Sequence, residues 1–210
     1  MKTHKINNSY YNSLYKKFGD TSLSLGWRGK SNLKRFDHLI EDFKLNDSSV
    51  LDVGCGLGHL INHLKKKYIK TYMGIDINRE FIKKNKKKFK LLKYKFKNIS
   101  FEKFRSRGFD YVIQNGMFNL KANQKQYKYV EACLRKMFYL CNYAVSSNFI
   151  SSQAKIRYSK NFYYDPVKIL KICYSITPNL ILKNNFFPYE FTIVLFKEKK
   201  INEDSYFKNI

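Results

Sequence analysis

The sequence lacks the features of a membrane-spanning or secreted protein. No apolar run approaches the roughly 20 residues of a membrane-spanning helix, and residues 1–9 are polar, without the apolar core of a signal peptide. Cysteine is scarce, and none of the four cysteines forms a C-x-x-C pair, which favours buried thiols over metal ligands. We therefore expect a cytoplasmic protein, with no membrane partner and no metal, whose free thiols are Cys55, Cys133, Cys141 and Cys173.

Acidic residues are also scarce. The chain has 16 Asp and Glu against 41 Lys and Arg, which gives a net charge of +25. Such a charge is typical of nucleic-acid-binding proteins, but charge alone supplies only non-specific affinity. The excess is mostly Lys beside abundant Asn, Ile, Tyr and Phe, as in a coding sequence biased towards A and T. Nucleic acid is therefore an alternative partner rather than the favoured one.

The composition suits one folded domain. A chain of 210 residues with 44% hydrophobic residues is long enough to fill a core. We divide it into an N-terminal segment or lid over 1–24, a main domain over 25–198, and a polar C-terminal tail over 199–210.

One stretch organises the main domain: S-V-L-D-V-G-C-G-L-G-H-L at residues 49–60. An apolar run ends in an acid, breaks at three alternating glycines and continues at helical spacing, which predicts a strand, a tight loop and a helix. Such glycines let a ligand approach the main chain. The third glycine comes one residue too early for G-x-G-x-x-G, and the lysine of a P-loop is missing. Asp52 at the strand tip suits a cationic or amine-bearing ligand better than a phosphate.

The glycine loop and Y-M-G-I-D-I-N at residues 72–78 together resemble the first two motifs of class I S-adenosylmethionine-dependent methyltransferases. The resemblance implies S-adenosylmethionine as cofactor, a nucleoside with a sulfonium and an amino-acid tail. Asp76 follows the last glycine by 18 residues, close to the roughly 20-residue offset of a ribose-binding acid. A carboxylate can accept hydrogen bonds from two vicinal hydroxyls. A nicotinamide oxidoreductase is least favoured, because the third glycine is displaced.

The resemblance and the alternating pattern predict an α/β, Rossmann-like class I methyltransferase fold. We expect a seven-stranded, mostly parallel sheet with an antiparallel C-terminal strand and helices on both faces. The expected strands cover residues 49–53, 70–75, 94–97, 109–113, 143–149, 179–183 and 190–196. The expected helices cover a short segment within 10–18, then 33–43 with Leu33 on the buried face, 60–68 with Tyr68 on the apolar face, 78–89 with Asn78 as its cap, 127–141, and a last helix that Asp165 caps and Pro166 begins.

The resemblance also implies which residues contact the cofactor, since ligands of open α/β sheets bind beyond the carboxyl ends of the strands. A Gly-Trp segment followed by Arg-Phe precedes the loop in the bacterial group that the chain resembles most, which implies that Arg35 reaches the cofactor carboxylate. Asn98 stands where the family commonly has an acid for the adenine amine, and its oxygen can still accept. The predicted cofactor-binding residues are Arg35, Asp52, Gly54, Cys55, Gly56, Gly58, Asp76, Ile77, Asn98, Ile99, Gln114 and Asn115.

Methyl transfer from an activated sulfonium mainly requires alignment and exclusion of water. We assign no catalytic residue. His59 and His63 lie four residues apart but have no acid or thiol partner for a metal. A polar loop over 150–161 is expected to cover the site. The candidates for a general base are His38, His59, His63, Tyr163, Tyr164 and Glu190.

The acceptor is the open part of the prediction. The loop at 114–120 is not the Asn/Asp-Pro-Pro-Tyr/Phe type, which argues against methylation of the adenine amine in DNA. The short chain shows no appended recognition domain, which favours a small-molecule or metabolite acceptor. The alternatives are an RNA or protein methyltransferase that uses the basic surface, and a non-catalytic cofactor-binding protein of the same fold. The oligomeric state is left open.

Overall fold

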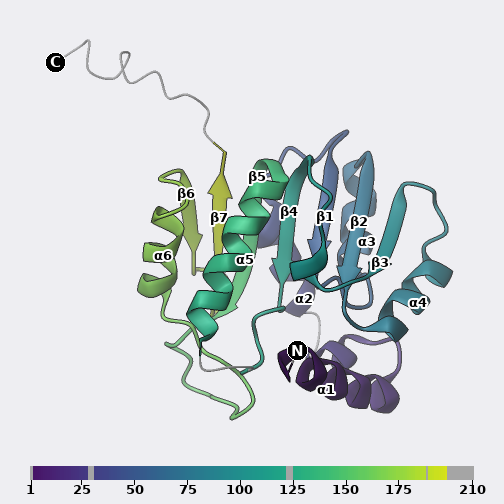
Figure 1. Cartoon of the computed structure of the whole chain (residues 1–210), viewed down its shortest axis with the longest axis horizontal. Coiled ribbons are helices and arrows are strands. Elements are labelled where there is room, and N and C mark those ends of the chain that lie inside the picture. The colour runs from purple at the N-terminus through teal and green to yellow at the C-terminus, as the bar shows by residue number, and fades with distance from the viewer. Residues whose placement is uncertain (1, 28–30, 122–124, 188, 198–210) are drawn as a thin grey trace.

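The computed structural model describes residues 2–27, 31–121, 125–187 and 189–197. Figure 1 shows a twisted sheet between layers of helices, with α1 (Lys2–Phe18) lying across one end of the strands. The predicted tail over 199–210 and Pro188, which we expected in the last turn, lie outside the described residues.

The described strands form one seven-stranded sheet in the order β3-β2-β1-β4-β5-β7-β6. The ladders from β3 to β5 are parallel, while β7 pairs antiparallel with both β5 and β6. Six strands therefore share one direction and the C-terminal strand opposes them, which confirms the predicted mixed sheet. The strands are β1 (Ser49–Val53), β2 (Thr71–Asp76), β3 (Tyr94–Asn98), β4 (Phe109–Asn115), β5 (Cys141–Ile150), β6 (Leu180–Lys183) and β7 (Glu190–Phe196).

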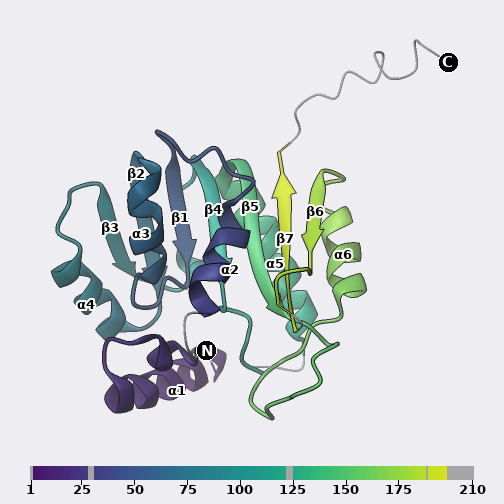
Figure 2. The same ribbon diagram turned by 180° about the vertical axis from the view of Figure 1, so that it is seen from behind.

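Helices cover both faces of this sheet, as predicted (Figure 1 and Figure 2). One face packs against α2, α3 and α4, and the opposite face packs against α5 and α6. The helices are α2 (Ser31–Ile40), α3 (His59–Leu64), α4 (Arg79–Lys88), α5 (Gln126–Leu140) and α6 (Pro166–Tyr174), with 3₁₀ turns η1 (Ser22–Leu25), η2 (Lys65–Lys67) and η3 (Phe101–Lys103).

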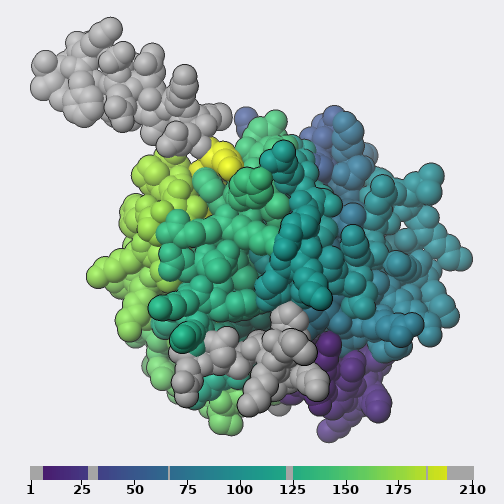
Figure 3. Space-filling model, viewed as in Figure 1, coloured from purple at the N-terminus to yellow at the C-terminus, as the bar shows by residue number. Residues whose placement is uncertain are grey.

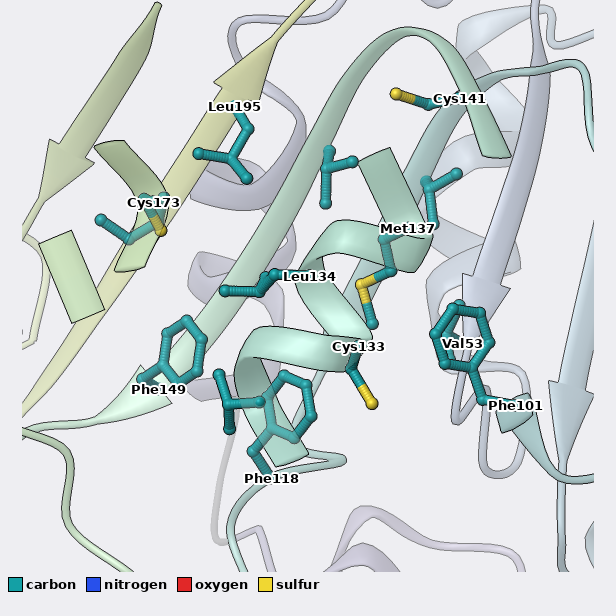
Figure 4. Close-up of a cluster of buried hydrophobic side chains, with 14 of the residues drawn as sticks. Val53, Phe101, Phe118, Cys133, Leu134, Met137, Cys141, Phe149, Cys173 and Leu195 are labelled. Carbon is teal, nitrogen blue, oxygen red and sulfur yellow. The ribbon is translucent and has the colours of Figure 1, made fainter. Parts of the chain in front are cut away.

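Alternation along the strands sends successive side chains into two separate cores. In β1, Val50 faces the core beneath α2 and α3, whereas Leu51 and Val53 face the core beneath α5. Figure 4 shows part of the second core, where Leu134 and Met137 of α5 pack over the sheet. The four cysteines, all within the described residues, are buried and free, as predicted.

Two helix starts follow the predicted capping chemistry. Asn78 Oδ1 accepts from Glu80 N at 3.0 Å and so caps α4. Asp165 Oδ1 accepts from Val167 N at 2.8 Å and caps α6, with Pro166 at its first position.

Several element boundaries differ from the prediction, among them that of the N-terminal helix, which was expected as a short segment within 10–18 and covers Lys2–Phe18. The helix after the glycine loop ends at Leu64, and Tyr68 is 79% exposed instead of buried, because its φ of 49° cannot continue a right-handed helix. The helix expected over 33–43 ends at Ile40, and Leu33 is 47% exposed because the sheet is contacted one turn further on. The helix expected to reach Cys141 ends one residue earlier, since β5 begins there to pair with β4.

The parallel strands give the molecule two chemically distinct edges. In Figure 1, β1, β2, β3 and β4 begin at the upper edge and end at the lower one, where α1 lies. Figure 3 shows the N-terminal segment packed on the lower end of the surface. The loops that follow the strands therefore meet beneath the sheet, against α1.

Candidate functional site

A cavity lies at the carboxyl ends of β1, β2 and β4. The space between its walls is about 1020 Å³ when the open solvent at its mouth is included. The glycine loop and the strand ends form its floor. Residues of α1 and Trp27, on the segment before α2, close it from outside.

Two glycines of the loop are closely approached by neighbouring side chains. Gly56 has φ of 51°, and a Cβ there would lie 2.9 Å from Leu25 Cδ2. Gly58 has φ of 69°, and its Cβ would lie 2.8 Å from Phe89 Cε2. The left-handed backbone also favours glycine at both positions. Asn85 of α4 then fixes the loop, since its Nδ2 donates to Gly56 O at 2.8 Å.

Asp76, at the tip of β2, ties the second strand to the glycine loop. Its Oδ2 accepts from Gly56 N at 2.9 Å and its Oδ1 accepts from Asn78 N at 2.7 Å. Burial raises the pKa of this carboxyl above its ordinary value, although the amides beside it act in the opposite direction. Each carboxylate oxygen can accept a second hydrogen bond, so Asp76 can bind two hydroxyls of a ligand while it holds the loop.

Asp52, at the tip of β1, is a buried acid with an unusual titration. Tyr72 OH donates to its Oδ2 at 2.6 Å. Burial raises the pKa of Asp52 to about 7, despite that hydrogen bond. Because a nearby positive charge favours the ionised form, a cationic ligand in the cavity would drive the Asp52 proton off.

Several polar atoms that line the cavity have no hydrogen-bond partner among the described residues. They are Asn7 Oδ1, Asn8 Oδ1, His59 Nδ1 and both side-chain atoms of Asn115. Burial lowers the pKa of His59, so the neutral imidazole is favoured. Unpaired buried polar atoms are costly and uncommon. Beside the carboxyl groups of Asp52 and Asp76, they fit a ligand that carries both donors and acceptors.

The structure brings eight of the twelve predicted residues to this cavity. The other four lie behind it. Gly58 packs on Asn85 and Phe89. Asn98 Nδ2 donates to Asp76 O at 3.0 Å, and the Nε2 of buried Gln114 donates to Asn148 O at 3.4 Å. The fourth is Arg35. The residues that line the cavity are Asp52, Gly54, Cys55, Gly56, Asp76, Ile77, Ile99 and Asn115.

Arg35 of α2 pairs with Glu190 at the start of β7. Its Nε donates to Glu190 Oε2 at 2.6 Å, and a second nitrogen bonds Oε1. The guanidinium lies 5.5 Å from the Trp27 ring centroid and 4.9 Å from that of Phe187. Trp27 lines the cavity, so Arg35 stands directly behind its wall. The predicted contact between Arg35 and a ligand carboxylate stays a prediction.

The sequence suggested that residues 1–24 form a lid but did not identify which of them line the cavity. Asn7, Asn8 and Tyr11 line the cavity. Tyr11 packs edge-on against Phe81 at 6.5 Å between ring centroids, and Asn78 Nδ2 donates to Asn12 Oδ1 at 2.8 Å. The aromatic spacing that suggested a short helix was the available signal, but it did not reveal where that helix docks.

Among the candidate bases, His59 lines the cavity. His63 Nε2 lies 2.8 Å from Asp37 Oδ1, His38 Nδ1 lies 3.1 Å from Glu41 Oε1, and Tyr164 OH donates to Phe118 O at 2.9 Å. The polar loop expected over the site reaches α1 instead, where Lys160 Nζ lies 4.6 Å from the Tyr10 ring centroid.

Two absences among the described residues set limits on the site. No group of three or more His, Cys, Asp or Glu side chains is placed to hold a metal ion there. Within the same part of the chain, none of the helices is both long enough and apolar enough to traverse a bilayer.

Comparison with known proteins gives a family and a fold. A family model described as "Methyltransferase domain" matches residues 44–186. No curated protein matches the chain. Magnesium protoporphyrin IX methyltransferase (ChlM) from Synechocystis with bound SAH is 15% identical, with a TM-score of 0.70 over 93% of this chain and 100% of that one.

Two further solved structures are similar. The DhpI–SAH complex is 12% identical, with a TM-score of 0.70 over 92% of this chain and 96% of that one. A TehB-like SAM-dependent methyltransferase from Corynebacterium glutamicum is 15% identical, with a TM-score of 0.60 over 91% of this chain and 99% of that one. At these identities the likeness establishes the fold.

Proposed function

Because the chain belongs to the methyltransferase-domain family, as its motifs predicted, we propose that it transfers a methyl group from S-adenosylmethionine to a small-molecule acceptor. The observation that carries this proposal is the cavity at the carboxyl edge, where Asp76 holds the glycine loop and unpaired polar atoms face inward. Similar folds crystallised with SAM or SAH support the choice of cofactor.

The lining offers a partner for each part of that cofactor. Asp76 would accept from the ribose hydroxyls, and the apolar side chains of Ile77 and Ile99 would flank the adenine. Asn115, with both polar atoms unpaired, offers a donor and an acceptor to the charged amino-acid tail. Asp52 would complement the positive charges of the ligand, as its position at the end of β1 predicted.

When bound, S-adenosylmethionine supplies an electrophilic methyl group on a sulfonium. The chain's own task is then to align the acceptor and to exclude water. α1 and Trp27 serve this task by covering the cavity. We assign no general base, although neutral His59 is available within the lining.

The cover over the cavity favours a small acceptor. Asn7, Asn8 and Tyr11 of α1 line the cavity together with the strand ends, so an acceptor must fit beside this helix. Under this proposal residues 1–24 form a lid on a methyltransferase domain of residues 25–198. ChlM, whose name gives magnesium protoporphyrin IX as its substrate, is an example of this fold acting on a small molecule.

An RNA or protein acceptor is the second candidate, favoured by the net charge of +25. A non-catalytic cofactor-binding protein is the third. The test is transfer of labelled methyl from S-adenosylmethionine to three pools: a metabolite extract, total RNA and total protein. We expect label in the metabolite pool and loss of it in Asp76→Asn. Label in RNA or protein would support the second candidate, and tight cofactor binding without label in any pool would support the third.

A further inference from the structure

The edge of the sheet opposite the cavity carries a different chemistry. Two lysine-rich segments lead into β2 and β3. They are K-K-K-Y-I-K at residues 65–70, which includes η2, and K-K-K-F-K-L-L-K-Y-K at residues 86–95, which includes the end of α4 and the start of β3. Together they contain ten lysines and no acid. Both lead into strands that begin at the upper edge in Figure 1, far from α1.

These two segments form one surface. Tyr72 N donates to Lys93 O at 2.9 Å, and Lys93 Nζ donates to Ile69 O at 3.3 Å. In Figure 3 this part of the chain forms the blue-teal surface on the right of the molecule. We call the surface made by Lys65, Lys67, Tyr68, Lys70, Lys90, Leu91, Leu92 and Lys93 the β2–β3 rim.

The rim exposes apolar side chains among its lysines. Leu92 is 94% exposed, Tyr68 is 79% exposed and Leu91 is 58% exposed. Tyr68 also has φ of 49°, the left-handed conformation in which it ends η2. Single exposed apolar residues are ordinary, but Leu91 and Leu92 are adjacent in the chain and are both exposed among lysines, which marks an interaction surface.

The combination of aliphatic, tyrosine and lysine side chains identifies the partner. Lysine clusters attract anionic lipid headgroups, leucine gains by entering the acyl boundary, and tyrosine is enriched at the headgroup level. Phosphates of a nucleic acid would attract the lysines but offer nothing to Leu91 and Leu92. Three acids lie beside Lys67 and Tyr68: the Asp47 amide donates to Tyr68 O at 3.1 Å, and Asp37 and Glu41 line a hollow with Lys67 and Tyr68. The charged residues within 65–70 and 86–95 are all lysines.

We propose that the β2–β3 rim binds the surface of an anionic lipid bilayer, with Leu91 and Leu92 entering the headgroup boundary. This contact needs no membrane-spanning helix. It orients the molecule so that the cavity at the opposite edge of the sheet faces away from the bilayer (Figure 1). The proposal does not depend on the cofactor or on the acceptor.

The test is co-sedimentation of the full chain with vesicles of phosphatidylglycerol and phosphatidylcholine, compared with phosphatidylcholine alone. We expect binding to the anionic vesicles that weakens as salt is added. Leu92→Ser should weaken it about tenfold, the loss that about two buried methylene groups produce. Lys67→Glu with Lys90→Glu should weaken it by about thirtyfold or more.

Matched controls come from α6, at the other end of the sheet. Val167 is an exposed aliphatic residue, and Lys168 and Lys171 are exposed lysines, so Val167→Ser and Lys168→Glu with Lys171→Glu should leave vesicle binding unchanged. No binding to anionic vesicles at low salt, or equal binding by Leu92→Ser and the unsubstituted chain, would overturn the proposal. Salt-dependent binding to single-stranded RNA without vesicle binding would also overturn it and identify nucleic acid as the partner.

Discussion

The two edges of this sheet differ in charge and in burial. At the carboxyl edge, Asp52 and Asp76 are enclosed with a glycine loop under α1. At the amino edge, the β2–β3 rim exposes lysines, two leucines and a tyrosine. The net charge of +25 for the whole chain therefore describes the rim but not the cavity, whose lining contains the acids Asp52, Asp76 and Glu102.

That difference separates selective binding from long-range attraction. Buried carboxylates with fixed hydrogen-bond partners select a ligand by shape and by donor position, whereas exposed lysines attract any polyanion and are screened by salt. Substitutions at the carboxyl edge should therefore change cofactor affinity strongly, and those at the amino edge weakly.

The largest effect is expected from Gly58→Ala. The left-handed φ of 69° and the contact with the Phe89 ring should together lower the free energy of unfolding by about 2–4 kcal/mol, measured by urea denaturation. Gly108→Ala is the matched control before β4, because Gly108 has φ of 84° but a Cβ added there would meet nothing within 4 Å. It should cost about 1–2 kcal/mol. Equal losses would mean that crowding in the glycine loop contributes nothing.

The next effect is expected from Asp76→Asn. The Asn side chain has one oxygen that accepts and one nitrogen that donates, so it cannot accept from both Gly56 N and Asn78 N and also bind two hydroxyls. The affinity for S-adenosylmethionine should therefore fall about a hundredfold. Competition with labelled cofactor measures it.

The matched acid at the amino edge is Asp110, whose Oδ2 accepts from Ser49 N at 2.8 Å and from Ser49 Oγ at 2.9 Å. Asp110→Asn should lower thermal stability while leaving cofactor affinity within about twofold. If the two variants lost affinity alike, the loss at Asp76 would reflect general destabilisation.

A pH effect of intermediate size is expected from Asp52. Its pKa is raised to about 7, so its contribution to stability is present at acidic pH and is lost as pH rises through about 7. A cationic ligand needs the ionised form, and S-adenosylmethionine should therefore bind about tenfold more weakly at about pH 6 than at about pH 8.

Titrations of the cofactor across this range check the effect. Asp52→Asn should bind with a nearly constant affinity over the same pH interval, and S-adenosylhomocysteine, which lacks the sulfonium charge, should show a smaller pH effect with the unsubstituted chain. A pH dependence that survives in Asp52→Asn would assign it to another group.

A smaller effect is expected from Tyr11→Ala. The substitution opens the cover that α1 places over the cavity, so the cofactor should dissociate about tenfold faster, as stopped-flow fluorescence would show. Tyr139→Ala, at an exposed position near the amino edge, is the control and should leave dissociation unchanged. An unchanged rate in both variants would remove the lid role of α1.

The smallest effect is expected at the rim. Lys67→Glu with Lys90→Glu should change cofactor affinity by less than about twofold, because exposed charges at the opposite edge are screened. Calorimetry at low and high salt measures it. A large loss would mean that the two edges are coupled.

The site residues that could be predicted lie close together in the sequence. Gly54, Gly56 and Asp76 were identifiable because the loop and the following strand tip lie close in sequence, and each lines the cavity. Glu190 and Arg35 were both noted, but their pairing over 155 residues has no sequence signal.

The position of α1 and the exposure of Tyr68 could not be predicted from the sequence. Asn7, Asn8 and Tyr11 reach the cavity only because α1 packs on Phe81, and an amphipathic pattern does not specify which surface a helix covers. Tyr68 fitted the helical repeat, yet the chain turned before it.

The function proposed for this protein requires cofactor binding at the carboxyl edge. Isothermal titration of the unsubstituted chain with S-adenosylmethionine, S-adenosylhomocysteine and NAD tests it. We predict one-to-one binding of the first two ligands, with micromolar affinity, and no binding of NAD. Absence of heat with both adenosyl ligands, from protein whose folding is confirmed by circular dichroism, would contradict the account.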